Sequence, residues 1–332
     1  MFEMFEKMFI IKHYKQLFTI KCSYVIIIAR QKFYVNTKKG DNKMLVSMKE
    51  MLADAKKNGY AIPAFDVSNY EMMKAVLETC EEERSPALLM GLGVDLQGKN
   101  MNLITSMVQG ASNYFNVPVC FHLDHATEFD FIKKAIDAGF SSVMYDGSVL
   151  PFDKNAENTA IITKYAHERG ITVEAELGHV GNASVGSISE TGADEDPGES
   201  LTVPNEVAKF IEITNVDALA VAIGTAHGVY KKTPTLRIDR LDEITAVAKT
   251  PLVLHGGSGT PDDQMKMAIK HGITKINIYS DVLFALNQSL KNTLNNISNP
   301  STWPFIVYED AIKNMKEVVR KKLKEFGSVG RV

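Results

Sequence analysis

Short apolar runs alternate with amphipathic segments along most of the chain after residue 59. The apolar runs predict eight strands, at residues 61–67, 86–91, 119–126, 142–147, 172–178, 218–224, 251–257 and 275–280. Between them, hydrophobic residues recur at helical spacing, as in 129–139, 205–214 and 262–272. Strands that are apolar on both faces and separated by helices are typical of a parallel sheet covered on both sides.

This alternation predicts an α/β fold, a closed (β/α)₈ TIM barrel. Eight strand–helix units in about 240 residues fit a closed barrel better than an open sheet. A doubly wound sheet is the alternative, but no G-x-G-x-x-G follows the first predicted strand. The long polar, glycine-rich segment 179–202 is predicted to be an active-site loop.

The first 43 residues do not share this pattern. Their longest uncharged run, residues 22–29, is far too short for a bilayer, which requires about 20 apolar residues. A helix start is predicted just after them, because Ser47 precedes Glu50 by three residues, the spacing of a capping box. We therefore expect residues 1–43 to be an extension outside the fold, with a surface-seeking helix as the alternative, and residues 44–332 to form a single barrel domain with a C-terminal helix.

Charge and cysteine content narrow the class of protein. Residues 44–332 hold 28 Lys and Arg against 37 Asp and Glu, a net charge of −9. An acidic domain argues against nucleic acid as a partner, and no segment predicts a membrane span. The three cysteines lack C-x-x-C spacing, which indicates reduced thiols and a cytoplasmic protein.

Three of the eight histidines fall at the ends of predicted strands. His125, His227 and His255 end the third, sixth and seventh strands, and a TIM barrel gathers its chemistry at the carboxyl ends of its strands. A single histidine at a strand end is ordinarily a hydrogen-bonded structural residue. Three on one rim predict a divalent metal site with open coordination positions. Zinc is the first expectation, and the ligand type also admits Co²⁺ or Fe²⁺.

Acidic residues accompany these histidines. Asp124 adjoins His125, so we expect its carboxylate to exchange a proton with a metal-bound substrate; the alternative is an N-cap of the following helix. Glu174 and Glu176 point to one side of the fifth strand. Glu176, nearer the strand end, is expected to lie behind the metal ligands or act as an alternate ligand, and Glu174 to be paired deeper in the barrel.

The last two strands end in residues suited to an anion. Glycine backbones can turn their N–H groups toward phosphate, and serine hydroxyls add donors. TIM barrels commonly bind phosphate after strands seven and eight. The residues predicted to bind substrate there are Gly256, Gly257, Ser258, Asn277, Ile278, Tyr279 and Ser280.

The motifs that carry these residues resemble a known family. "PAFDVSN", "HLDHATEFD", "SSVMYDGS", "VEAELG", "AVAIGTAHGVY", "PLVLHGGSG", "KINI" and "EFGSVGR" are similar to those of the class II, metal-dependent ketose-bisphosphate aldolases, which include fructose- and tagatose-bisphosphate enzymes. The resemblance implies that the three histidines bind one catalytic zinc, that Asp124 is the proton donor and acceptor, and that Gly228 joins the phosphate-binding residues. It also implies Na⁺ or K⁺ near the phosphate and a homodimer or homotetramer.

The reaction implied is reversible cleavage of fructose 1,6-bisphosphate to dihydroxyacetone phosphate and glyceraldehyde 3-phosphate through a zinc-stabilised enediolate. Tagatose 1,6-bisphosphate is the alternative substrate, because Tyr279 stands where many fructose enzymes have Asp. The loop acid of the family has no clear counterpart, so Glu190 or a later acid would serve. A zinc hydrolase and a non-catalytic sugar-phosphate-binding protein are the competing hypotheses. A Schiff base on Lys275 is discounted, because this lysine is predicted at the entry of its strand, far from the metal.

Overall fold

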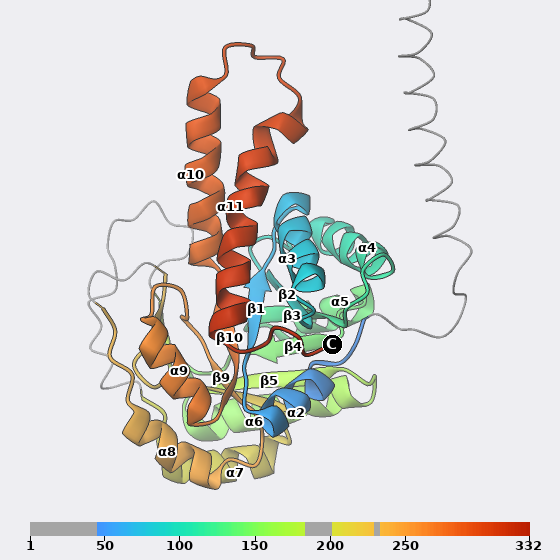
Figure 1. Cartoon of the computed structure of the whole chain (residues 1–332). Coiled ribbons are helices and arrows are strands. Elements are labelled where there is room, and N and C mark those ends of the chain that lie inside the picture. Colours follow the sequence, from blue (N-terminus) through green and yellow to red (C-terminus); the bar gives the residue numbers. More distant parts are fainter. Residues whose placement is uncertain (1–44, 183–200, 229–232) are drawn as a thin grey trace, which may run out of the picture. The chain divides into compact units, whose positions relative to one another are not determined.

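The strands form a closed barrel, as the alternating pattern predicts (Figure 1). The computed structural model describes residues 45–182, 201–228 and 233–332. Within them, all neighbouring barrel strands are parallel and follow the order β1-β10-β9-β7-β5-β4-β3-β2 around the ring. The predicted extension, residues 1–43, and most of the predicted loop 179–202 lie outside the described residues.

Eight strands make up the barrel in the described part of the chain. They are β1 (Ile62–Asp66), β2 (Ala87–Leu92), β3 (Val119–Ala126), β4 (Ser142–Tyr145), β5 (Thr172–Leu177), β7 (Ala218–Val221), β9 (Leu252–Leu254) and β10 (Ile273–Ile278). Each lies within or next to a predicted run. Two further short strands, β6 (Gly181–Asn182) and β8 (Ala226–His227), follow β5 and β7 along the chain. They pair with each other in a separate small sheet.

All the described helices but the first, which precedes β1, follow the strands and cover the outside of the barrel. Those described are α2 (Met48–Asn58), α3 (Tyr70–Glu82), α4 (Asn100–Ser112), α5 (Phe129–Ala138), α6 (Phe152–His167), α7 (Pro204–Thr214), α8 (Ile238–Val247), α9 (Asp262–Lys270), α10 (Ser280–Asn296) and α11 (Pro304–Glu325). The start of α2 is confirmed, because the Ser47 side chain accepts a hydrogen bond from the Glu50 N–H. The orange and red helices α10 and α11 lie side by side and extend beyond the barrel (Figure 1).

The barrel strands send alternate side chains to opposite faces. In β3, Phe121 and Leu123 belong to the core between the sheet and the helices, whereas Cys120 belongs to the core inside the barrel. The inner core also contains side chains of α2, such as Met48 and Leu52. Because the period of a strand is two residues, Asp124 shares the inward face of Cys120.

Strict alternation would turn His125 away from Asp124, and the backbone prevents this. The pairing of β3 with β4 shifts register between Leu123 and Ala126. At His125 the backbone has φ of 46°, in the left-handed region that few non-glycine residues adopt. Such an irregularity re-aims a side chain at the end of a strand. It therefore brings the imidazole and the carboxylate of adjacent residues to the same rim.

No helix of the described residues has both the length and the apolar character needed to cross a membrane.

Candidate active site

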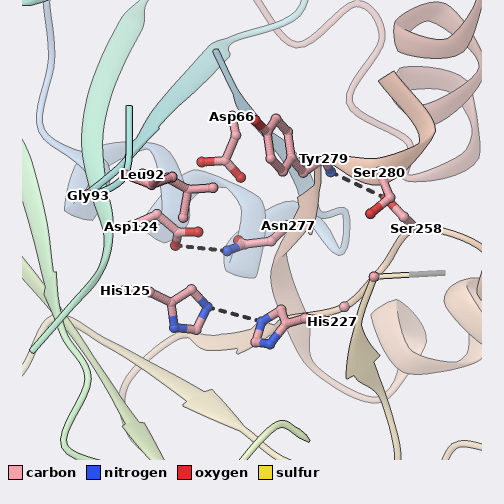
Figure 2. Close-up of a pocket in the computed structure, with 13 residues that line it drawn as sticks. Asp66, Leu92, Gly93, Asp124, His125, His227, Ser258, Asn277, Tyr279 and Ser280 are labelled. Atoms are coloured by element: carbon pink, nitrogen blue, oxygen red, sulfur yellow. Dashed lines mark hydrogen bonds between the residues drawn. The ribbon is translucent and has the colours of Figure 1, made fainter. Parts of the chain in front are cut away.

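A cavity opens at the carboxyl ends of the strands, on the rim that the sequence predicts. Its volume is about 290 Å³. Figure 2 shows side chains from β1, β3, β8 and β10 meeting around it. The lining residues are Asp66, Leu92, Gly93, Val94, Asp124, His125, His227, Gly228, Gly256, Ser258, Asn277, Tyr279 and Ser280.

The three predicted histidines converge beside this cavity: His125 and His227 line it, and His255 is buried next to them. The Nε2 atom of His125 lies 3.0 Å from Nε2 of His227 and 2.8 Å from Nδ1 of His255. One nitrogen from each ring falls within a 4.8 Å cluster able to hold a metal ion. Two nitrogens bound tetrahedrally to one zinc are about 3.3 Å apart, so little movement separates this arrangement from a coordination site.

Carboxylates hydrogen-bonded to two of the imidazole rings determine which nitrogen of each ring carries the lone pair. The far nitrogen of His125, Nδ1, lies 2.8 Å from Oδ2 of Asp146, and the far nitrogen of His255, Nε2, lies 2.8 Å from Oε1 of Glu174. A carboxylate accepts the N–H of such a ring, which leaves the other nitrogen with a lone pair. Both remaining lone pairs face the point where the three rings meet. This donor set fits a divalent metal such as zinc.

The electrostatics favour a cation at the same point. Burial lowers the pKa of His227 and of His255 well below the ordinary value, so both rings are neutral at pH 7. Burial also acts to lower the pKa of His125, but Asp124 and the hydrogen bond to Asp146 outweigh it and raise this pKa to about 10. The surrounding carboxylates therefore stabilise one positive charge among the three rings. In the metal-free protein this charge is a proton on His125, and a bound metal ion would displace that proton from Nε2.

Asp124 faces the cavity and is held by a partner on β10. Its side chain is 3% exposed, and its Oδ1 accepts a hydrogen bond of 3.0 Å from the Asn277 amide. The alternative prediction, an N-cap of the next helix, is wrong. Helix α5 has Glu128 at its N-cap position and no side-chain cap, because β3 continues through Asp124 to Ala126.

Glu176 lies beside the histidine cluster, as expected. Its Oε2 is 3.4 Å from Nδ1 of His255, and its Oε1 accepts the Val180 N–H at 2.9 Å. Glu176 also forms a second possible metal-binding group with His125 and Asp146. Burial, with the nearby charge of Asp146, raises the pKa of Glu176 to about 8.

The predicted phosphate-binding residues divide into two groups. Gly228, Gly256, Ser258, Asn277, Tyr279 and Ser280 line the cavity. The Ser258 hydroxyl accepts the N–H groups of Tyr279 and Asp281, each at 3.3 Å, and so tethers the seventh-strand loop to the first turn of α10. Gly257 and Ile278 are not brought to the cavity. The Gly257 N–H donates to Asn277 at 3.1 Å, and the Ile278 side chain is fully buried in the core.

Lys275 requires a correction. Strand β10 begins two residues earlier than predicted, at Ile273, so Lys275 lies inside the strand and not at its entry. Its Nζ is 2.9 Å from Oε2 of Glu174, whose other oxygen contacts His255. The lysine is therefore one carboxylate away from the histidine cluster. It still does not line the cavity, which agrees with discounting a Schiff base. The pairing of Glu174 deep in the barrel is confirmed.

We expect Lys275→Met to lower the free energy of unfolding of the metal-free protein by about 3–5 kcal/mol, because it leaves the Glu174 charge buried and unpaired. Both side chains of this pair are 0% exposed. Urea denaturation measures the change. Lys321→Met is the matched control: its pair with Asp262 has side chains 63% and 49% exposed, so the loss should stay below about 1 kcal/mol. Equal losses in the two variants would contradict the assignment.

Two residues of the site had no assigned role in the sequence. Asp146 was visible at the end of the fourth strand, but only the fold shows it behind His125. Its other oxygen accepts the Ser148 hydroxyl at 2.6 Å, and that hydroxyl in turn contacts His179. Asp66, the last residue of β1, faces the cavity. A carboxylate that ends a buried strand was the available signal in both cases. The proposed loop acid, Glu190, lies outside the described residues.

Comparison with known proteins gives consistent results. The family model described as fructose-bisphosphate aldolase class-II matches residues 46–331. A protein of Staphylococcus epidermidis named fructose-bisphosphate aldolase is 40% identical over 290 residues, 86% of this chain and 99% of the relative. The protein of that name from Staphylococcus aureus strain N315 is 40% identical over 293 residues, with the same coverage. The crystal structure of the YdjI aldolase from Escherichia coli K12 superposes with a TM-score of 0.76 at 31% identity, covering 86% of this chain and 99% of the other.

Proposed function

The chain belongs to the class II fructose-bisphosphate aldolase family, and on that premise we propose that it cleaves a ketose phosphate reversibly into dihydroxyacetone phosphate and an aldehyde. The first substrate to consider is fructose 1,6-bisphosphate, which gives glyceraldehyde 3-phosphate; tagatose 1,6-bisphosphate is the alternative. The observation that carries the proposal is the meeting of three imidazole nitrogens beside the Asp124 carboxylate. His125, His227 and His255 would hold a zinc ion. When bound, that ion would supply Lewis-acid polarisation of the ketose carbonyl.

Asp124 moves the proton in this proposal. In the cleavage direction its carboxylate takes the proton of the C4 hydroxyl, and the C3–C4 bond breaks. C4 becomes the aldehyde carbon, and the electron pair stays with the three-carbon fragment, which then takes up a proton at C3. The Asn277 amide fixes the carboxylate through its hydrogen bond, so one oxygen is oriented and the other is left to act as the base.

The phosphate of the three-carbon fragment would bind at the start of α10. The first turn of a helix carries a partial positive charge, which suits an anion. Two N–H groups here, those of Tyr279 and Asp281, already donate to the Ser258 hydroxyl. Ser258 and Ser280 add hydroxyl donors, and Gly228 and Gly256 allow the backbone to approach closely, since both have positive φ. A Na⁺ or K⁺ ion near this phosphate is part of the proposal.

We also propose a cytoplasmic homodimer or homotetramer. Cys80 and Cys120 are free and buried, which suits a reducing compartment.

The experiment that tests the function is a coupled assay on the zinc-loaded full chain. Release of dihydroxyacetone phosphate is followed by NADH oxidation with an auxiliary dehydrogenase, using fructose and tagatose 1,6-bisphosphates. We expect metal-dependent release from at least one of them. Hydrolysis of esters or amides without triose-phosphate release would support the zinc hydrolase instead. Sugar-phosphate binding without turnover would support a binding protein.

A further inference from the structure

Asp66 is a buried acid that the proposed mechanism does not use. It is 4% exposed, it lines the cavity, and its Oδ1 has no hydrogen-bond partner among the described residues. Figure 2 shows its carboxyl group between the Tyr279 ring and Asp124, directed into the cavity. Buried carboxyl oxygens are nearly always hydrogen-bonded. An unpartnered one that faces a binding cavity therefore marks a place for a donor on the ligand.

The position of Asp66 in the cavity places it next to the aldehyde half of a bound ketose. Ser258 and Ser280 lie on one side of the cavity in Figure 2, and Leu92 and Gly93 lie on the opposite side. A phosphate bound at the two serines directs the rest of a ketose past the histidines toward Asp124 and the end of β2. Asp66 ends the strand adjacent to β2 and therefore lies along the aldehyde half, where a sugar presents hydroxyl groups.

The same region is unfavourable for an anion. Burial raises the pKa of Asp66 well above its usual range, and the charge of Asp124 adds to this effect, whereas the charges of His125 and Lys275 oppose it. A phosphate group placed beside Asp66 would also be desolvated, and two acidic side chains, Asp66 and Asp124, line the same cavity. Moreover, none of the described residues that line the cavity is a lysine or an arginine.

We propose that Asp66 binds the terminal hydroxyl group on the aldehyde half of the substrate, the group that carries phosphate in a 1,6-bisphosphate, and so makes the site favour ketose 1-phosphates over ketose 1,6-bisphosphates. This inference rests on the proposed aldolase function and narrows its substrate class: the aldehyde that is released carries hydroxyl groups and no phosphate.

The test is Asp66→Asn in the zinc-loaded full chain, with kcat/KM measured for fructose 1-phosphate and fructose 1,6-bisphosphate. Asparagine keeps the shape of the side chain but replaces one carboxyl oxygen by an NH2 group, so the side chain loses one hydrogen-bond acceptor. We expect the wild type to prefer fructose 1-phosphate. In the variant, the ratio of the two kcat/KM values should move toward the bisphosphate by about tenfold, the factor that corresponds to one hydrogen bond. A ratio is informative because general damage to the fold lowers both values alike.

Asp95→Asn is the matched control. It removes a negative charge close to Asp66 from a residue that does not line the cavity, so the ratio should change less than about threefold. Zinc content and thermal unfolding of each variant establish that it is folded. If the enzyme cleaves both substrates and Asp66→Asn leaves their ratio unchanged, the inference is overturned and the aldolase function stands. If the wild type cleaves neither, both are overturned.

Discussion

Replacing Asp124 with alanine should lower kcat by about 10²- to 10⁴-fold, the usual contribution of a positioned general base, while the protein keeps its zinc. The three ring nitrogens that converge beside the cavity belong to other residues, so the metal site does not need this carboxylate. Turnover does need it, because Asp124 is the group we assign to the C4 hydroxyl proton. The coupled assay gives kcat, and elemental analysis gives the zinc content of the purified variant.

Asp124→Asn sharpens this experiment. The amide preserves the size of the side chain and can still contact Asn277, but it cannot accept a proton as a carboxylate does. We expect it to be nearly as inactive as the alanine variant. Near-normal turnover in either variant would contradict the assigned proton role. Loss of zinc in parallel with activity would show instead that Asp124 supports the metal site.

Most of the barrel could be predicted because its signal is local. Strands such as Ala218–Val221 and Leu252–Leu254 are short apolar runs between amphipathic helices, and a parallel, doubly covered sheet imposes that pattern. The start of α2 was predictable for a similar reason, since a capping box lies within four residues. The start of β10 was not. Residues Ile273 and Thr274 directly follow Gly272, which lies two residues after the end of α9, and only pairing with β9 extends the strand over them.

Only those residues of the site that lie at the ends of predicted strands could be predicted from the sequence. The topology of a parallel barrel places His125, His227 and His255 on one rim, so their convergence follows from the fold. The side-chain contacts that support these histidines depend on which residues of different strands lie close together across the barrel. The spacing of residues in the sequence does not determine this. Lys275 reaches Glu174 from a strand 101 residues away, and Asp146 meets His125 because the backbone of His125 adopts positive φ. Such pairings arise from register and local backbone geometry.

The second prediction with a large expected effect is the loss of activity when the metal is removed. Treatment with a chelator should abolish cleavage, because the lone pairs of His125 and His255 are directed at one point by their carboxylate partners, and that point is where the proposal places zinc. Borohydride added with substrate should leave activity intact, because no lysine lines the described cavity. His227→Ala, which removes one of the three rings, should lose both the metal and the activity.

The convergence of three imidazoles on one divalent ion is the central claim, and a zinc titration of the chelated, metal-free protein tests it most directly. Activity in the triose-phosphate assay should rise in proportion to added zinc and level off at one zinc per chain, with His227→Ala inactive throughout. Full activity without metal, or a His227→Ala variant that recovers wild-type activity at one equivalent of zinc, would contradict it.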